Sequence, residues 1–306
     1  MSLTQPPRSV LVANQKGGVG KSSIVAAVAD MVAAAGRRVL VVDADQQANL
    51  TSSDLGVEGD RGKGLSMALQ YAHPLEPIRE VRPNLDLLPG GPALAVIGAI
   101  AATAAQSGMD LRGNLVSTLT ELQSVEQYDL ILIDSGPGDA PLLDALLGTA
   151  RYLLVPTKDD DGSLSGVELL AARYLRARQN GSVIQLLGVV LFDANPRATA
   201  RNREIFGQLA HQLEGSGAAP FGAFIRSDKA AAVDLRSHHM TPLELVAAAE
   251  NQLKSRIQRL RDKRRGGLEL WSRDPSGLAS DYQSLTREVL RRLAAAEKDE
   301  VSGGVS

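Results

Sequence analysis

Short apolar runs alternate with longer amphipathic stretches through most of the chain. Six runs rich in Val, Leu and Ile are almost continuously apolar, as in strands that are buried on both faces of a parallel sheet. They lie at 9–14, 38–43, 85–89, 128–134, 152–157 and 184–192. Helical periodicity predicts helices over 22–35, 111–124, 163–178 and 199–213. The pattern therefore predicts an α/β fold, with a mostly parallel twisted sheet covered by helices on both faces.

Two further helices are predicted toward the C-terminus. Thr241-Pro242-Leu243-Glu244 has the form of a capping box with proline at the first helical position, and it starts a basic helix over about 242–265. A second helix is predicted over about 280–297. Because the chain shows no internal repeat and no long Gly/Ser linker, we predict a single domain. Its predicted parts are a lead at 1–8, the domain at 9–297 and a flexible tail at 298–306.

Composition narrows the class of protein. The 306 residues contain no cysteine, which excludes thiolate-held zinc, iron–sulfur clusters and cysteine nucleophiles. The longest apolar stretch, 93–105, is shorter than the roughly 20 residues that a membrane-spanning helix needs. The first residues lack the apolar core of a secretory signal. We therefore expect a cytoplasmic protein with no membrane partner.

Charge is unevenly distributed along the chain. The formal net charge is −2, but residues 195–265 carry 13 Lys and Arg against 7 Asp and Glu. This asymmetry indicates a basic patch on an otherwise acidic body, which suits a nucleic-acid partner. A solvated helix face is the alternative.

The run "NQKGGVGKSS" at 14–23 connects the first predicted strand to the first predicted helix, as a phosphate-binding loop does. Its glycines let backbone N–H groups face phosphates, and the helix N-terminus adds its positive dipole end. Lys21 then reaches the β- and γ-phosphates, and the Ser22 hydroxyl binds Mg²⁺. The predicted nucleotide-binding residues of this loop are Gly17, Gly18, Val19, Gly20, Lys21, Ser22 and Ser23.

This loop has the form K-G-G-x-G-K-[ST], with Gln15 in place of the usual first glycine and an additional lysine, Lys16. Here the sequence resembles the deviant Walker-A ATPases, the ParA/MinD family of P-loop NTPases. Four more stretches are similar to family motifs: "VLVVDADQQANLT" (39–51), "LDLLPGGPALA" (85–95), "YDLILIDSGPG" (128–138) and "VPTKDDDGSLSGVELL" (155–170). The similarity covers roughly 9–245. Departures from the family pattern are Gln46, Ala48 and Ser135-Gly136.

The resemblance implies roles for individual residues. Lys16 is expected to cross an ATP sandwich homodimer and contact the phosphates of the partner subunit's ATP, like an arginine finger delivered in trans. Asp45 is the candidate that orients the attacking water, so the expected catalytic residues are Lys16, Lys21 and Asp45. Asp134 is expected to hold Mg²⁺ through water, together with Ser22. Asp43 is expected to support either the Mg²⁺ shell or the loop. By analogy, Asn195 and Pro196 pack on the adenine.

The resemblance also implies partners, and it favours a small-type ParA because only eight residues precede the first strand. Such a protein binds double-stranded DNA non-specifically, is associated with the nucleoid, and meets a centromere-binding ParB-type protein that stimulates hydrolysis. The candidate DNA contacts are Arg197, Arg201, Arg203, Arg226, Lys254, Arg256, Arg259, Lys263 and Arg264.

Two alternatives remain open at this point. One is the positioning of another cargo, either a membrane or a protein array. The other is a P-loop phosphotransferase or ligase with a small substrate of its own. For that enzyme the only obvious acid/base candidates are His73, His211, His238 and His239.

Overall fold

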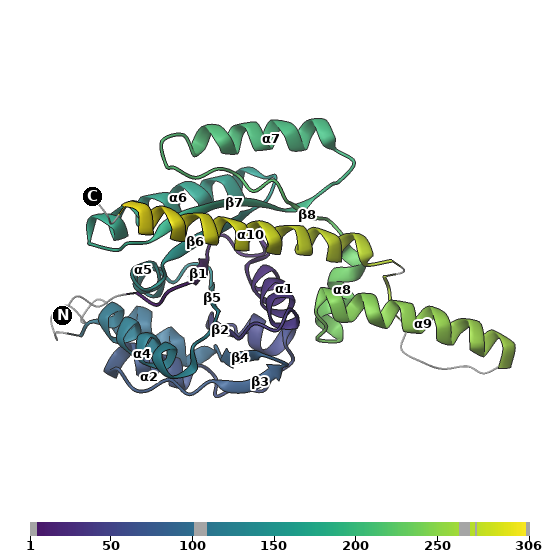
Figure 1. The fold of residues 1–306 in the computed structure, drawn as a ribbon, viewed down its shortest axis with the longest axis horizontal. Helices are drawn as coiled ribbons and strands as arrows, with labels where there is room; N and C mark the ends of the chain where they lie inside the picture. The colour runs from purple at the N-terminus through teal and green to yellow at the C-terminus, as the bar shows by residue number, and fades with distance from the viewer. Residues whose placement is uncertain (1–4, 101–108, 263–269, 273, 304–306) are drawn as a thin grey trace.

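The computed structural model describes residues 5–100, 109–262, 270–272 and 274–303. These residues form an eight-stranded sheet in the order β3-β4-β2-β5-β1-β6-β7-β8 (Figure 1). All neighbouring pairs are parallel except β3 and β4. The strands are β1 (Ser9–Val12), β2 (Val39–Ala44), β3 (Ile78–Arg82), β4 (Leu85–Leu88), β5 (Leu130–Ser135), β6 (Tyr152–Thr157), β7 (Gln185–Ala194) and β8 (Ile225–Arg226).

Helices connect the strands and cover both faces of the sheet, so the predicted α/β fold is confirmed. The longer helices are α1 (Lys21–Ala34), α2 (Lys63–Tyr71), α4 (Leu111–Glu126), α5 (Ala140–Thr149), α6 (Asp161–Gln179), α7 (Thr199–Gln212), α8 (Lys229–Ser237), α9 (Pro242–Asp262) and α10 (Ser276–Gly303). Two short helical turns follow β2 and β4, and these are η1 (Asn49–Asp54) and η2 (Pro92–Leu94).

Successive residues of the central strands pack into two separate apolar cores, one on each face of the sheet. Val10 and Val12 of β1 pack toward α1 and α10, whereas Leu11 between them packs toward α2, α4, α5, α6 and α7. β2 alternates in the same way, with Val39 and Val41 on the first face. Burial on both faces explains why these strands are continuous apolar runs in the sequence.

The carboxyl ends of the central strands bring the predicted site residues to one edge of the sheet. β1 lies between β5 and β6, and in the β1–β5 register Val12 pairs with Asp134. In the β2–β5 register Asp43 pairs with the same aspartate. The phosphate loop leaves β1 at this edge, where a parallel sheet places its ligands.

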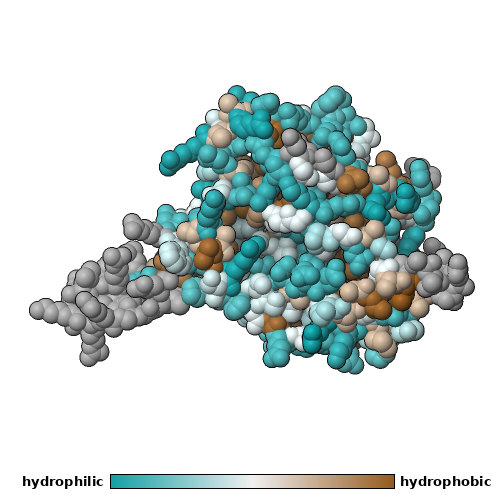
Figure 2. All heavy atoms as spheres, turned by 180° about the vertical axis from the view of Figure 1, so that it is seen from behind, coloured by the Kyte–Doolittle hydropathy of each residue, from teal (hydrophilic) through white to brown (hydrophobic). Residues whose placement is uncertain are grey.

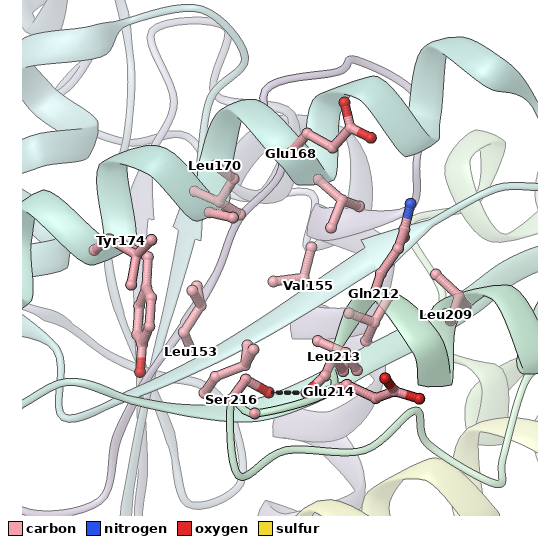
Figure 3. Close-up of a pocket in the computed structure, with 16 residues that line it drawn as sticks. Leu153, Val155, Glu168, Leu170, Tyr174, Leu209, Gln212, Leu213, Glu214 and Ser216 are labelled. Atoms are coloured by element: carbon pink, nitrogen blue, oxygen red, sulfur yellow. Dashed lines mark hydrogen bonds between the residues drawn. The ribbon is translucent and has the colours of Figure 1, made fainter.

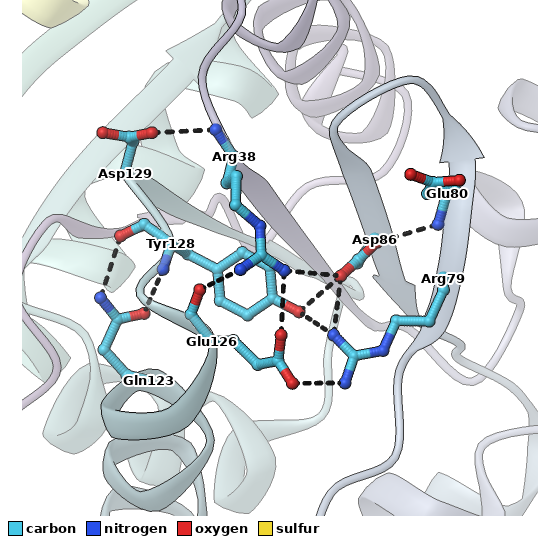
Figure 4. A network of polar contacts seen from close by, with 8 residues as sticks. All are labelled: Arg38, Arg79, Glu80, Asp86, Gln123, Glu126, Tyr128 and Asp129. Atoms are coloured by element: carbon cyan, nitrogen blue, oxygen red, sulfur yellow. Dashed lines mark hydrogen bonds and ion pairs between the residues drawn. The ribbon is translucent and has the colours of Figure 1, made fainter.

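A polar network holds the opposite, amino-terminal edge of the sheet (Figure 4). The Asp86 carboxylate accepts hydrogen bonds from Arg79 at 2.9 Å and from the Tyr128 hydroxyl at 2.7 Å. Glu126, at the end of α4, accepts from Arg79 and from Arg38, whose guanidinium lies over the Tyr128 ring. The network joins β3, β4 and the end of α4 to the residues just before β2 and β5, away from the phosphate loop.

The C-terminal helices differ from the prediction in extent. α9 projects away from the sheet (Figure 1), and it is described to Asp262, while residues 263–265 of the predicted basic helix lie outside the described residues. α10 runs to Gly303, beyond the predicted end at 297 and into the predicted tail. Glu297 pairs with Arg8, and Glu300 pairs with Arg151, so contacts with the sheet support this extension.

The outer surface is mainly hydrophilic on the face shown in Figure 2, with apolar groups scattered over it. Isolated apolar side chains of this kind are normal for a folded protein surface. Among the described residues, no helix has the length and apolar character needed to cross a membrane.

Candidate functional site

The phosphate loop is a glycine-rich turn between β1 and α1. Gly18 and Gly20 both have positive φ, +73° and +88°, which side chains other than glycine rarely adopt. At Gly20 a Cβ atom would also lie 2.3 Å from the ring of Phe192, at the end of β7. Phe192 therefore packs directly on the loop, a contact that the sequence analysis missed.

Lys21 turns inward at the first position of α1. Its side chain is almost fully buried, and its ammonium donates a 3.0 Å hydrogen bond to the carbonyl of Lys16. Burial lowers the pKa of Lys21, while the negative charges of Asp134 and Asp45 oppose that shift. An ammonium held in this way at the helix start is placed to meet phosphate oxygens.

Lys16 points elsewhere. Its ammonium forms an ion pair with Asp160, which lies between β6 and α6, and the Lys16 side chain is 36% exposed. The loop around it is fixed by Asn14, whose amide donates to the Pro156 carbonyl at 2.8 Å and accepts from the Lys16 backbone N–H at 2.9 Å. The two loop lysines thus face different environments, one buried and one half-exposed.

Asp43 serves as a support for the loop that follows β2. Its carboxylate accepts from the backbone N–H of Asp45 at 3.1 Å, and from the N–H and hydroxyl of Thr51 at 2.9 and 2.7 Å. Burial raises the pKa of Asp43 to about 6, and the hydrogen bonds from Thr51 oppose that shift. Its oxygens are therefore engaged in holding η1 against the sheet.

Asp134 has the opposite character. It is fully buried, and within the described part of the chain neither oxygen has a partner within hydrogen-bond geometry. Burial, together with the nearby Asp43, raises its pKa well above the ordinary value, and the hydroxyl of Ser22 and the ammonium of Lys21 oppose this. The Ser22 hydroxyl lies near the Asp134 carboxylate but does not form a hydrogen bond with it. A hydroxyl and a carboxylate are the kind of oxygen ligands that Mg²⁺ prefers. These residues fit the expected metal.

Asp45 is buried at the start of the turn after β2, and its carboxylate accepts from the Gln47 backbone N–H at 2.9 Å. A Cβ atom at Gly136 would lie 2.7 Å from the same carboxylate oxygen. The glycine in the departure Ser135-Gly136 therefore leaves room for Asp45. Ala48 adopts φ +51°, so the usual glycine is replaced by a residue held in the left-handed region.

Asn195 and Pro196 are exposed in the loop after β7, the strand that carries Phe192 to the phosphate loop. The Asn195 side chain accepts from the backbone N–H of Arg197 at 3.0 Å. The loop lies at the expected edge of the sheet, and contact with adenine stays a prediction.

Two of the predicted DNA-contacting arginines hold carboxylates of their own chain. Arg201 donates to both oxygens of Asp159, at 2.9 and 2.7 Å. Arg226 forms the same kind of fork with Asp281, at 2.6 and 2.8 Å, and Asp281 lies on α10. A DNA phosphate would have to displace these carboxylates.

The other candidate contacts form two groups. Arg197 and Arg203 are exposed at the start of α7, and neither has an ion-pair partner among the residues that the structure describes. The side chains of the remaining candidates, on α9 and just after it, lie outside the described side chains, and they are Lys254, Arg256, Arg259, Lys263 and Arg264.

Three supporting residues, Asn14, Asp160 and Phe192, were not predicted from the sequence. All three stand in motifs that resemble the family or in the strand before Asn195. The acidic run "KDDD" at 158–161 was a signal for a partner of Lys16. Recognising that role required knowing that the ends of β1 and β6 are neighbours.

Comparison with known proteins identifies the family to which the chain belongs. The sequence profile of a family described as an AAA domain matches residues 7–183. The chromosome-partitioning ATPase Soj of Thermus thermophilus is 33% identical over 216 residues, which cover 70% of this chain and 77% of Soj.

Solved structures share the fold. The structure of pnob8 ParA has a TM-score of 0.65 and 19% identity, and the match covers 95% of this chain and 99% of that one. Cobyrinic acid a,c-diamide synthase from Mycobacterium smegmatis, solved with ADP and magnesium, has a TM-score of 0.63 and 26% identity, and the match covers 76% and 92% of the two chains. With this fold, loop and sequence similarity, the chain belongs to the ParA family of partition ATPases.

Proposed function

We propose that this chain is an ATP-dependent DNA-segregation ATPase that works as an ATP sandwich dimer. In this proposal the dimer binds DNA non-specifically, and a centromere-binding ParB-type partner stimulates hydrolysis and releases it. The proposed cargo is a plasmid or chromosome. Because the dimer would bind DNA, the proposed location is the cytoplasm, in association with the nucleoid.

The observation that carries the proposal is the different placement of the two loop lysines. Lys21 is buried at the phosphate loop of its own subunit, whereas Lys16 is half-exposed and paired with Asp160. A lysine at the surface beside the loop is available to a second subunit. In a sandwich dimer it adds positive charge where negative charge develops during phosphoryl transfer.

The remaining site residues fit hydrolysis. Lys21 and the loop N–H groups would bind phosphates, and Ser22 and Asp134 would hold Mg²⁺, which would neutralise charge on the phosphates. Asp45 orients the attacking water, and Gly136 keeps the space beside its carboxylate open. Asp43 keeps Asp45 in place through the backbone N–H of that residue.

A mixture of two inactive variants tests the trans role of Lys16. Lys16→Ala lacks the trans lysine, and Asp45→Ala lacks the water-orienting carboxylate. In a mixed dimer, the Lys16→Ala subunit keeps its own Asp45 and receives Lys16 from the partner. We therefore expect ATP hydrolysis to return on mixing, and a mixture as inactive as the two variants alone would reject the trans role. Lys21→Ala is the control that loses nucleotide binding.

DNA binding is tested separately, by an electrophoretic shift with ATP. Duplex affinity is expected to depend on ATP, because a dimer joins two basic patches, and to fall with salt by about 0.9 log units per log unit of salt for each phosphate contacted. A triple variant should weaken binding to every DNA sequence alike and leave basal ATP hydrolysis unchanged. It combines Arg259→Glu, Lys263→Glu and Arg264→Glu. Unchanged affinity would move the DNA site to Arg197 and Arg203, or remove it.

A second function is favoured by one comparison, the likeness to a diamide synthase. In that function, ATP bound at the same loop would transfer a phosphoryl group to a small acceptor. Two of the four histidines are weak candidates for acid/base catalysis because they already have partners. His211 pairs with Glu214, and His239 forms a 2.9 Å hydrogen bond with the Ser53 carbonyl. ATP turnover that needs a metabolite and ignores DNA would favour the synthase-like function.

A further inference from the structure

A partly open apolar cavity lies between α6 and α7, against β6 and β7 (Figure 3). Its volume is about 380 Å³. Six buried side chains give it an apolar floor and walls, and they are Leu153, Val155, Leu170, Val189, Leu209 and Leu213.

The polar groups of the cavity stand mainly at its rim. Glu168, Gln212 and Glu214 are exposed, and the two carboxylates lie on opposite sides of the cavity in Figure 3. The Glu214 carboxylate also lies 3.3 Å from the His211 imidazole. The Ser216 hydroxyl is occupied by a 2.7 Å hydrogen bond to a backbone carbonyl. Tyr174 is half-buried, and its hydroxyl has no hydrogen-bond partner within the described ranges of the chain. The cavity thus offers apolar contact, one free hydroxyl and an acidic rim.

This cavity is separate from the phosphate loop. The residues that line it belong to the middle of α6, the end of α7 and the adjoining strands. α6 also reaches the loop at its first turns, where a Cβ atom at Gly166 would lie 2.4 Å from the side chain of Asn14. β7 likewise passes the cavity at Val189 and reaches Gly20 with Phe192. The cavity is therefore a second site on elements that also hold the loop.

We propose that this cavity binds a small, uncharged, mainly apolar molecule. Its volume falls at the small end of the range of about 300–1,000 Å³ that is usual for ligand pockets. An apolar ligand would gain packing contacts with the apolar side chains that line the cavity. The acidic rim disfavours a carboxylate head group by repulsion, while the Tyr174 hydroxyl can bond an uncharged oxygen.

The geometry favours a small molecule over a partner helix. The apolar residues lie between the inner faces of two helices and the sheet, and the six buried ones are at most 7% exposed. A docking helix needs an open apolar face on which to lie. The proposal does not depend on the function proposed above, because it concerns residues outside the nucleotide site.

Binding of the neutral fluorescent probe 1-aminoanthracene to the full chain without nucleotide tests this proposal. We expect saturable binding with one probe per chain, and displacement by 1-decanol. Decanoate should compete about tenfold or more weakly, because its carboxylate meets the acidic rim. Absence of saturable binding would overturn the proposal, and equal competition by decanoate would overturn the selection against charge.

A matched pair of variants on α6 locates the probe. Leu175 and Leu169 are both 58% exposed, but only Leu175 lines the cavity. Leu175→Trp should weaken probe binding about tenfold by blocking the space, whereas Leu169→Trp should leave it unchanged. Because both positions are on the surface, both variants should fold. Equal affinities for the two variants would place the probe elsewhere and reject this cavity as the site.

Discussion

Asp43 and Asp134 are register partners on the adjacent strands β2 and β5, and their carboxylates have opposite hydrogen-bonding states. Asp43 accepts three hydrogen bonds from Asp45 and Thr51, whereas neither oxygen of Asp134 has a hydrogen-bond partner in the described chain. Asp43 therefore supports the loop, and Asp134 is the proposed metal ligand.

This contrast predicts different effects of substitution. Asp43→Ala should lower the free energy of unfolding by about 1–3 kcal/mol, because buried donors lose their acceptor. Asp134→Asn should cost less than Asp43→Ala, because it removes no hydrogen bond from the described chain. It should also abolish the effect of Mg²⁺ on ADP affinity. Urea unfolding without nucleotide and ADP titrations with and without Mg²⁺ measure these effects. Equal destabilisation by the two variants would contradict the assignment.

Gly18 and Gly20 separate backbone strain from crowding. Both have positive φ, but a Cβ atom at Gly18 would meet nothing within 4 Å, whereas at Gly20 it would overlap the Phe192 ring. Gly18→Ala should therefore cost only backbone strain, about 1–2 kcal/mol. Gly20→Ala should cost more and weaken ATP binding further.

Replacing the aromatic ring provides the control for this pair. Phe192→Leu in the Gly20→Ala background should recover part of the lost stability, because the smaller side chain can move away from the new methyl group. The same change in the Gly18→Ala background should recover none. Urea unfolding of the four variants checks this, and equal recovery in both backgrounds would show that Phe192 does not crowd Gly20.

Asp160 is predicted to restrain Lys16 before the dimer forms. An exposed ion pair of this kind is worth about 0.2–1 kcal/mol, and two of them are released in each dimer, so Asp160→Asn should strengthen ATP-dependent dimerisation by up to roughly thirtyfold. Its neighbour Asp159 pairs with Arg201 instead and supplies the matched control, Asp159→Asn. Sedimentation with a non-hydrolysable ATP analogue measures the dimer constant. If both variants change it equally, the Lys16 pair is not the restraint.

The sequence predicts the central strands and the phosphate loop well, because their signals are local. A buried parallel strand is an apolar run, and the glycines and lysines of the loop follow one directly. β3 was missed because "IREVR" is a polar edge strand, and β8 has only two residues. α5 was missed although Asp139 caps it and a proline stands in its first turn.

Side-chain partnerships across the fold were harder to predict. Asp160 meets Lys16, and Phe192 meets Gly20, only because β1 lies beside β6 and near the end of β7. Charge and a place in the C-terminal third predict Arg226 as a DNA contact, but its fork with Asp281 depends on where α10 packs. Charge read along a sequence does not reveal which arginines are already bound within the chain.

Asp30 on α1 predicts a pH dependence of stability that is independent of the nucleotide site. Burial raises its pKa above the ordinary 3.8, with Glu244 adding to the shift and the Thr241 hydroxyl and Arg82 opposing it. One of its oxygens has no hydrogen-bond partner in the described chain. A raised pKa means that the folded protein holds this proton more tightly than the unfolded chain. The stability that this group contributes is therefore lost as pH rises from the ordinary carboxyl pKa through the folded value.

Asp30→Asn should remove this loss. The variant should match the normal chain in free energy of unfolding only well below pH 3.8, where the carboxyl group is protonated in both states. Above the raised pKa the variant should be the more stable of the two, because asparagine carries no charge to bury. Urea unfolding at acid and neutral pH measures the difference, with Glu121→Gln on the exposed face of α4 as the control. A difference between variant and normal chain that is the same at both pH values would show that Asp30 does not titrate with folding.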